Sequence, residues 1–262
     1  MDYKIILYVI FGILPSLTWL SYYLRKDVHP ESNKMVLKIF LWGALVTLPT
    51  LFVQIGFKKI LEITSSNFGL PGLDHLLELS LSQLTFLSFI AVSIYWFFII
   101  SFTEEIFKYL VVRTKVFSSP ELDEPLDIML YMVITALGFA ALENILYLFC
   151  PTDQMAFNDV VNRTILVSFV RFIGATFLHT LCSGILGYFI ALSICETKKK
   201  WRYVAYGILI SVGLHGLYDF SIMTMEGLFK IVTPILILIV LAFLVFSGFE
   251  KLKKMKGICK LN

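Results

Sequence analysis

The sequence has little charge for its length, which excludes an ordinary soluble domain. Only 16% of the 262 residues are Asp, Glu, Lys or Arg, whereas 58% are hydrophobic, and the mean hydropathy is +0.83. This composition is typical of a chain that crosses a membrane several times. The formal net charge of +3 is small, and no nucleic-acid recognition motif accompanies it. We therefore expect this chain to be surrounded by a lipid bilayer and to bind no nucleic acid.

Several common site signatures are also missing. The four cysteines (Cys150, Cys182, Cys195 and Cys259) have no CxxC or CxxxH spacing. This spacing argues against a disulfide framework, and Cys182 and Cys195 are interpreted as small packing residues. No HExxH motif occurs, so a catalytic metal would need ligands from separate helices. No internal repeat is found, which removes the main sequence support for an inverted-repeat transporter.

Seven apolar segments are long enough to cross a bilayer, which takes about 20 helical residues. They predict an all-α transmembrane bundle that forms one integral-membrane domain over residues 1–262, with its polar motifs between about 100 and 220. The first segment is interpreted as a span, because no small-residue cleavage site follows it. The expected spans are 4–24, 36–57, 83–112, 127–149, 164–194, 202–223 and 231–249.

Lysine and arginine are distributed unevenly between the two sides of this bundle. One side receives fifteen of them and the other side five, with Lys108 and Arg171 inside spans. The positive-inside rule then places the amino terminus outside and the carboxyl terminus in the cytoplasm. Between the spans, the acidic turn at 118–125 should begin the fourth helix. Residues 73–82 are expected to form a short interfacial helix.

Four of the apolar segments contain ionisable or strongly polar residues. A charge at the bilayer centre costs about 2.5–3.5 kcal/mol, so four such helices predict a polar site enclosed by the bundle. In three pairs, the two residues are four or eight positions apart and are therefore expected on the same face of a helix. The pairs are Glu104 with Lys108, Arg171 with His179, and His215 with Asp219. Asp219 is expected to accept a hydrogen bond from His215 and to fix its tautomer. The complete set is Glu104, Glu105, Lys108, Glu143, Asn144, Arg171, His179, His215 and Asp219.

The order of these motifs resembles the PrsW family of membrane proteases, from about Trp19 to Phe220. The segment from Trp19 to Asp27, ahead of Pro30-Glu31, is similar to the first-loop pattern of that family. The resemblance implies a multi-pass protein of a prokaryotic plasma membrane that hydrolyses peptide bonds of a membrane-anchored protein. In the best-known branch this substrate is an anti-sigma factor. The matching motifs are Glu104-Glu105-x-x-Lys108, Phe139-x-x-x-Glu143-Asn144, His179 and His215-x-x-x-Asp219.

The wider superfamily that the chain resembles includes the type II CAAX prenyl proteases and a scaffold subunit of γ-secretase. In the prenyl proteases the second motif ends in histidine, where this chain has Glu143. Their last motif pairs histidine with asparagine, where this chain has Asp219. Both differences add a carboxylate, which makes metal binding easier to accommodate.

Water is the expected nucleophile, because no serine or cysteine has a convincing base beside it. In the scheme that the superfamily favours, no cofactor is needed: Glu104 or Glu105 activates water, and His179 and His215 hold the water and the oxyanion. In the alternative scheme a zinc ion is held by His179, His215 and a carboxylate, which is Asp219, Glu143 or one glutamate of the 104–105 pair, and a glutamate remains as base. The candidate metal ligands are His179, His215, Asp219 and Glu143.

The remaining polar residues receive supporting roles. The expected catalytic residues are Glu104, Glu105, His179, His215 and Asp219, and the supporting ones are Lys108, Glu143, Asn144 and Arg171. Of these, Arg171 is interpreted as a counter-charge for Glu143 and Asn144 as a helix–helix contact.

Two other protein classes also bury such residues. An ion- or proton-coupled transporter is one, but the chain lacks repeats and pairs of Gly/Pro-broken helices. A non-catalytic membrane scaffold is the other, and the complete Glu104-Glu105 pair argues against it.

Overall fold

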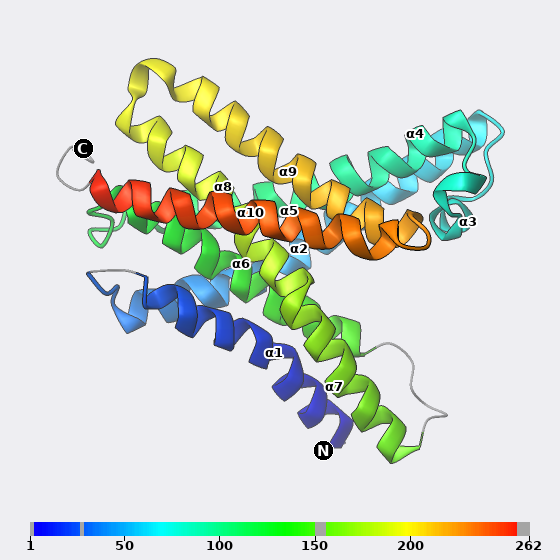
Figure 1. Cartoon of the computed structure of the whole chain (residues 1–262), viewed down its shortest axis with the longest axis horizontal. Coiled ribbons are helices and arrows are strands. Elements are labelled where there is room, and N and C mark those ends of the chain that lie inside the picture. Colours follow the sequence, from blue (N-terminus) through cyan, green and yellow to red (C-terminus); the bar gives the residue numbers. More distant parts are fainter. Residues whose placement is uncertain (1–2, 27–28, 150–155, 256–262) are drawn as a thin grey trace.

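The computed structural model describes residues 3–26, 29–149 and 156–255. Within these residues all regular structure is helical, and seven helical segments are long and apolar enough to cross a membrane (Figure 1). The predicted all-α bundle of seven spans is therefore confirmed. Positions outside the described residues include Asp27 of the first-loop pattern, Cys150, Cys259 and the tail lysines Lys256 and Lys260.

The helices follow the predicted apolar segments, with three larger differences at segment ends. The second span continues to Asn67 instead of ending at 57, and its added turns place Lys58 in an ion pair with Asp74 (Nζ to Oδ1, 2.5 Å). The fifth begins at Phe157 instead of 164, and the seventh continues past 249 to Lys254. The elements are α1 (Tyr3–Leu24), α2 (Asn33–Asn67), α3 (Leu73–Glu78), η1 (Leu81–Gln83), α4 (Phe86–Ile94), the π-helix η2 (Tyr95–Phe102), α5 (Thr103–Lys115), α6 (Pro125–Leu148), α7 (Phe157–Ile173), α8 (Ala175–Cys195), η3 (Thr197–Lys199), α9 (Lys200–Thr224) and α10 (Phe229–Lys254).

The central helix is α6, which packs against α1, α2, α5 and α8 (Figure 1). Of its membrane-spanning window, 94% is buried inside the protein. The helix begins at the predicted acidic turn, with Pro125 in its first turn. There the Asp127 carboxylate accepts hydrogen bonds from the backbone N–H groups of Asp123 (3.1 Å) and Glu124 (2.7 Å). Because α6 is buried over this window, the polar residues within it face protein and not lipid.

Two glycines allow α2 and α6 to touch through their backbones. A Cβ atom at Gly138 would lie 2.0 Å from the carbonyl oxygen of Phe40, and one at Gly43 would lie 2.2 Å from that of Thr135. Small residues permit this close approach between membrane helices, where packing replaces the hydrophobic effect as the driving force. The contact therefore fixes α2 against the central helix.

The third span is one continuous helix whose middle is a π-helix. α4, η2 and α5 follow one another without a break from Phe86 to Lys115. Side-chain hydroxyls bind carbonyl groups of the wide turns: Ser101 donates to the Trp96 oxygen (2.7 Å) and Thr103 to the Ile99 oxygen (2.5 Å). π-Helical turns often mark functional sites, and this one ends at Phe102, two residues before Glu104.

The fifth predicted span is two helices, because the chain breaks at Gly174 between α7 and α8. Gly174 has φ −90° and ψ −97°, and a Cβ atom there would lie 2.6 Å from the Tyr218 hydroxyl oxygen. The Trp19 indole N–H donates to the carbonyl oxygen of Phe172 (2.9 Å), close to the end of α7. Arg171 and His179 therefore lie on different helices and not on one helix face.

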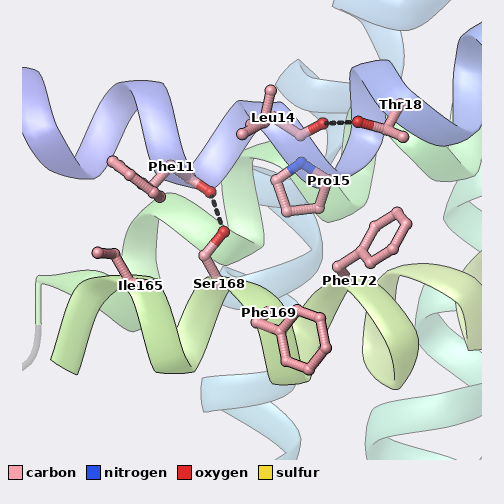
Figure 2. Close-up of a pocket in the computed structure, with 8 residues that line it drawn as sticks. All are labelled: Phe11, Leu14, Pro15, Thr18, Ile165, Ser168, Phe169 and Phe172. Atoms are coloured by element: carbon pink, nitrogen blue, oxygen red, sulfur yellow. Dashed lines mark hydrogen bonds between the residues drawn. The ribbon is translucent and has the colours of Figure 1, made fainter. Parts of the chain in front are cut away.

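A groove of about 300 Å³ on the outside of α1 and α7 is apolar (Figure 2). Pro15 has no backbone N–H, so it cannot donate to the carbonyl oxygen of Phe11 four residues earlier. The Ser168 hydroxyl of α7 donates to that oxygen instead (2.7 Å). The hydrogen bond from Ser168 thus satisfies a backbone carbonyl that Pro15 leaves without a donor, and the groove carries no catalytic group.

Shorter features agree with the sequence in part. Helix α3 and the turn η1 lie in the segment 73–82 that was expected to be helical. Cys182 is buried and free, as expected of a packing residue.

The orientation of the bundle in the membrane stays a prediction that reporter fusions can test. A reporter active only outside the cytoplasm should be inactive after Asn262 and active within residues 58–80, because of the fifteen-to-five distribution of Lys and Arg. The opposite activity of both fusions would reverse the orientation.

The backbone contact of α2 with α6 predicts that Gly138→Ala destabilises the protein. Its new methyl group would meet the Phe40 carbonyl, and overpacking of this kind costs about 1–3 kcal/mol. Thermal unfolding in detergent measures the effect. Gly56→Ala on α2 is the matched control, because nothing lies within 4 Å of a Cβ atom there. Equal stability of the two variants would contradict the described contact.

Candidate active site

A cavity of about 410 Å³ is formed by residues of α2, η2, α5, α6, α7, α8 and α9. Its size lies in the range of ligand pockets in proteins. One part of its wall is aromatic and aliphatic: Leu51, Tyr95, Trp96, Ile100, Phe139, Leu146, Tyr147 and Leu178. The other part is polar: Thr47, Gln54, Glu104, Glu143, Arg171, His179, His215 and Asp219. The four polar segments of the sequence therefore do meet at one site.

The Glu104 carboxylate lies between the two histidines. Its Oε2 atom is 3.6 Å from Nδ1 of His179 and 3.8 Å from Nε2 of His215. Its Oε1 atom accepts a hydrogen bond from the Gln54 amide (3.3 Å). Only 7% of this side chain is exposed, compared with 21% for Glu143 and 22% for Asp219. The cavity is therefore most open beside Glu143 and Asp219, and Glu104 lies deeper.

Glu105 lies behind Glu104, fully buried and outside the cavity lining. Lys108 donates to Oε1 of Glu105 (2.9 Å) and more weakly to Oε2 of Glu104 (3.4 Å). The Ser183 hydroxyl donates to the other oxygen of Glu105 (2.7 Å). The predicted pair of Glu104 with Lys108 is thus formed, but Lys108 binds Glu105 more closely. Of the two adjacent glutamates, only Glu104 faces the cavity.

Each histidine is held by a carboxylate on its outer side. Nδ1 of His215 lies 3.0 Å from Oε1 of Glu105, and Nε2 of His179 lies 2.8 Å from Oε2 of Glu143. Carboxylates only accept hydrogen bonds, so these ring nitrogens carry the protons. In the neutral rings, the remaining nitrogens present lone pairs on the side of Glu104. Such carboxylate–histidine pairs orient histidines in many metal sites.

Asp219 does not make the hydrogen bond with His215 that the sequence predicts. Its Oδ2 atom lies 3.5 Å from Nε2 of His215, an ion-pair distance without a hydrogen bond. The hydrogen bond that orients His215 comes from Glu105 on another helix. The i,i+4 spacing brings Asp219 close to the ring, but it leaves the carboxylate available to the cavity.

Arg171 pairs with Glu143, and Asn144 contacts neighbouring helices. Nη2 of Arg171 lies 2.8 Å from Oε2 of Glu143, an ion pair whose angles fall outside those of a hydrogen bond. Nε of Arg171 donates to the Asn144 side-chain oxygen (2.5 Å). The Asn144 amide in turn donates to the Thr176 hydroxyl on α8 (3.0 Å) and the Gly12 carbonyl on α1 (3.2 Å). Asn144 therefore joins three helices.

The charges of this site do not cancel when both histidines are neutral. Four carboxylates (Glu104, Glu105, Glu143 and Asp219) lie with two cations (Lys108 and Arg171) around the cavity, which leaves a formal charge of −2. An uncompensated buried charge is strongly unfavourable. Either added protons or a divalent cation would balance this charge.

Glu104, His179 and His215 can hold a metal ion, because one ligand atom from each lies within 4.8 Å of the others. Tetrahedral zinc with bonds of about 2.1 Å separates its ligand atoms by about 3.4 Å, close to the observed 3.6 and 3.8 Å. Of the carboxylates that the sequence offers as ligands beside the two histidines, Glu104 is the one in this group, and Asp219 and Glu143 are not. Glu143 binds the outer nitrogen of His179, on the far side from this group.

Three residues of the site are absent from the sequence prediction: Gln54, Thr103 and Ser183. Gln54 donates to both Thr103 Oγ1 and Glu104 Oε1 at 3.3 Å. Ser183 lies four residues after His179, and this spacing is a signal that could have identified it. For Gln54 the signal is a lone amide within the apolar run of α2.

Comparison with known proteins identifies the family. A family described as "PrsW family intramembrane metalloprotease" matches residues 31–247. The chain belongs to the PrsW family. The resemblance that the motifs indicate is therefore confirmed, and the match includes every candidate site residue.

Curated relatives extend the similarity over most of the chain. The Protease PrsW of Oceanobacillus iheyensis is 28% identical over 87% of this chain and 88% of its own length. The Protease PrsW of Bacillus subtilis is 26% identical over 94% of both chains, and that of Geobacillus kaustophilus is 29% identical over 82% and 79%. No solved structure matches this chain. Together with the seven apolar helices, these relatives make the chain a multi-pass bacterial membrane protease.

The buried charge network predicts that Lys108→Met strongly destabilises the protein. The change would leave Glu104 and Glu105 without their shared cation, and breaking a buried ion pair costs about 3–5 kcal/mol. Arg113→Met, which removes an exposed cation from the same helix, is the control. Adding Glu105→Gln to Lys108→Met should restore part of the thermal stability in detergent. A Lys108→Met protein as stable as the control would contradict this network.

Proposed function

We propose that the chain hydrolyses peptide bonds of a membrane-anchored protein with water as the nucleophile, and that Glu104 is the central group of the reaction. The observation that supports this most is the approach of the Glu104 carboxylate to the inner nitrogen of each histidine, the one that no other carboxylate holds by a hydrogen bond, inside a cavity. Peptide hydrolysis needs a base for water, stabilisation of the oxyanion and an acid for the leaving amine. The site offers carboxylates for the proton transfers.

The donor set fits a zinc ion held by Glu104, His179 and His215. Two histidines and one glutamate form a known ligand set of catalytic zinc, and a divalent cation would balance the formal charge of −2. The lone pairs of both histidines also point the right way for ligation. Such an ion, when bound, supplies a Lewis acid that polarises the scissile carbonyl and acidifies water.

The other residues then divide the remaining tasks. Glu105 and Glu143 hold the rings of His215 and His179 through their outer nitrogens. Asp219 lies in the cavity without a hydrogen-bond partner among the described residues. It is the carboxylate free to take the proton of water and pass it to the leaving amine.

A metal-free scheme is the second candidate, because Lys108 Nζ lies 2.9 Å from Nδ1 of His179 and competes for that nitrogen. In this scheme Glu104 itself removes the proton from water. The histidines must then gain a proton before they can stabilise an oxyanion, since their neutral forms direct lone pairs toward it. The two schemes share Glu104 and differ in what binds the oxyanion.

The substrate that we propose is a single-span protein, in particular an anti-sigma factor. The aromatic and aliphatic wall of the cavity (Leu51, Tyr95, Trp96, Leu146 and Leu178, among others) suits apolar side chains of a membrane segment. The choice of an anti-sigma factor rests on the family resemblance alone. Reconstitution with a panel of tagged single-span anti-sigma factors in liposomes tests it, and cleavage of none would contradict this substrate.

Glu104→Gln should abolish cleavage of such a substrate in both schemes, because the amide keeps the shape but neither binds a proton nor carries charge. Glu250→Gln, an exposed change on α10, should leave cleavage unchanged. Normal cleavage by the Glu104→Gln variant would show that Glu104 takes no part in the reaction.

Metal analysis of the purified protein separates the two schemes. We expect on the order of one zinc ion per chain, lost together with activity in His179→Ala and His215→Ala. Asp219→Asn should keep the metal and lose cleavage. Metal-free protein that cleaves and ignores chelators would instead establish the scheme without zinc.

A further inference from the structure

Gln54 lies at the proposed reaction centre although α2 carries none of the family motifs. Its side chain is 7% exposed and reaches from α2 to the start of α5. The amide nitrogen Nε2 lies 3.3 Å from Oε1 of Glu104 and 3.3 Å from the hydroxyl oxygen of Thr103. One amide group thus contacts two consecutive residues of the helix that presents Glu104.

The hydrogen-bond partners determine which way the Gln54 amide points. The Thr103 hydroxyl donates its only hydrogen to the carbonyl oxygens of Ile99 (2.5 Å) and Ile100 (3.0 Å), so toward Gln54 it can only accept. An ionised Glu104 also only accepts. Both neighbours therefore require the NH₂ group of Gln54, and its carbonyl must point the other way.

Gln54 also connects Glu104 to the π-helix. The carbonyl groups that Thr103 binds belong to η2, whose last residue, Phe102, directly precedes α5. The position of Thr103 is therefore set by η2, and that of Gln54 by Thr103. The close contact of Gly43 with α6 fixes the same helix α2 about three turns earlier.

The two oxygens of Glu104 consequently have different surroundings. Oε1 is held by Gln54, while Oε2 faces His179, His215 and, at 3.4 Å, Lys108. Without Gln54, the carboxylate could turn about its terminal bond, which has a broad torsional minimum. A small misplacement of a reacting group can lower a rate about 100-fold.

We propose that Gln54 is a positioning residue that holds Oε1 of Glu104 so that Oε2 is directed at the two histidines. This inference rests on the proposed role of Glu104. An apolar run tolerates an amide such as Gln54 when the amide is hydrogen-bonded, so a purely structural helix contact is the competing explanation. If Gln54 positions Glu104, its removal lowers the turnover rate of folded protein. If Gln54 is only a helix contact, its removal lowers the folded fraction.

Gln54→Met tests the proposal, because methionine has nearly the same shape and donates no hydrogen bond. We expect kcat for the single-span substrate to fall about 10- to 100-fold, with KM changed less than about twofold, because the cavity wall that binds the substrate is intact. Thr50→Val is the matched control. It removes another buried hydrogen-bonding group from α2, one turn away, whose hydroxyl binds only the Val46 carbonyl.

A second pair of variants tests the same link from α5 and does not depend on how well Gln54→Met folds. Thr103→Val removes the hydroxyl that accepts from Gln54 and should lower kcat. Thr103→Ser keeps this hydroxyl and should have a kcat close to that of the wild type. Thermal unfolding in detergent is measured for every variant, so that activity is expressed per folded protein.

Each outcome bears on the proposal separately from the proposed function. Wild-type kcat in folded Gln54→Met, or equal impairment of Thr103→Ser and Thr103→Val, would overturn the positioning role. A loss of activity fully explained by the folded fraction would also overturn it, in favour of a structural contact. Glu104→Gln that still cleaves would overturn the proposed function itself, whatever Gln54 does.

Discussion

Pairing charges away from water is the constraint on which the rest of this structure depends. Glu105 and Lys108 are completely buried, and a membrane interior offers no solvent to compensate either charge. They pair with each other within α5, and their further partners come from other helices: Ser183 and His179 from α8, and His215 from α9. Satisfying these groups therefore requires α5, α8 and α9 to meet at one place, and the arrangement of the bundle follows from that need.

The same network divides the carboxylates into two groups. Glu105 and Glu143 orient the histidines and form ion pairs. Glu104 and Asp219 line the cavity, as Glu143 also does, and hydrogen-bond to neither histidine. Four residues of nearly identical chemistry thus acquire different tasks through their neighbours. Preorganisation of this kind is what an enzyme needs when charge develops during the reaction.

The sequence predicts well whatever depends on one helix at a time. The seven spans, the start of α6 at Pro125 and the Glu104–Lys108 pair follow from hydropathy, capping and i,i+4 spacing. Apolar runs interrupted by charge also identify nearly the whole site, because such residues are costly in a membrane without a reason.

What the sequence misses depends on contacts between helices. The spacing of His215 and Asp219 suggests a hydrogen bond, yet Glu105 from another helix takes that position. The break at Gly174 depends on the space left by Tyr218, and Gln54 acquires its meaning only when α2 lies beside α5. Helical spacing contains no information about a neighbouring helix, so these features require the tertiary structure.

The uneven exposure of the four carboxylates has a consequence for how the two reactants arrive. Glu143 and Asp219 are the most exposed of them and Glu104 lies deeper. In the proposed reaction, a peptide that docks beside Glu143 and Asp219 would cover the path from these residues to Glu104. Water bound at Glu104 before the peptide docks would avoid this obstruction, so the depth of the cavity favours one order of arrival.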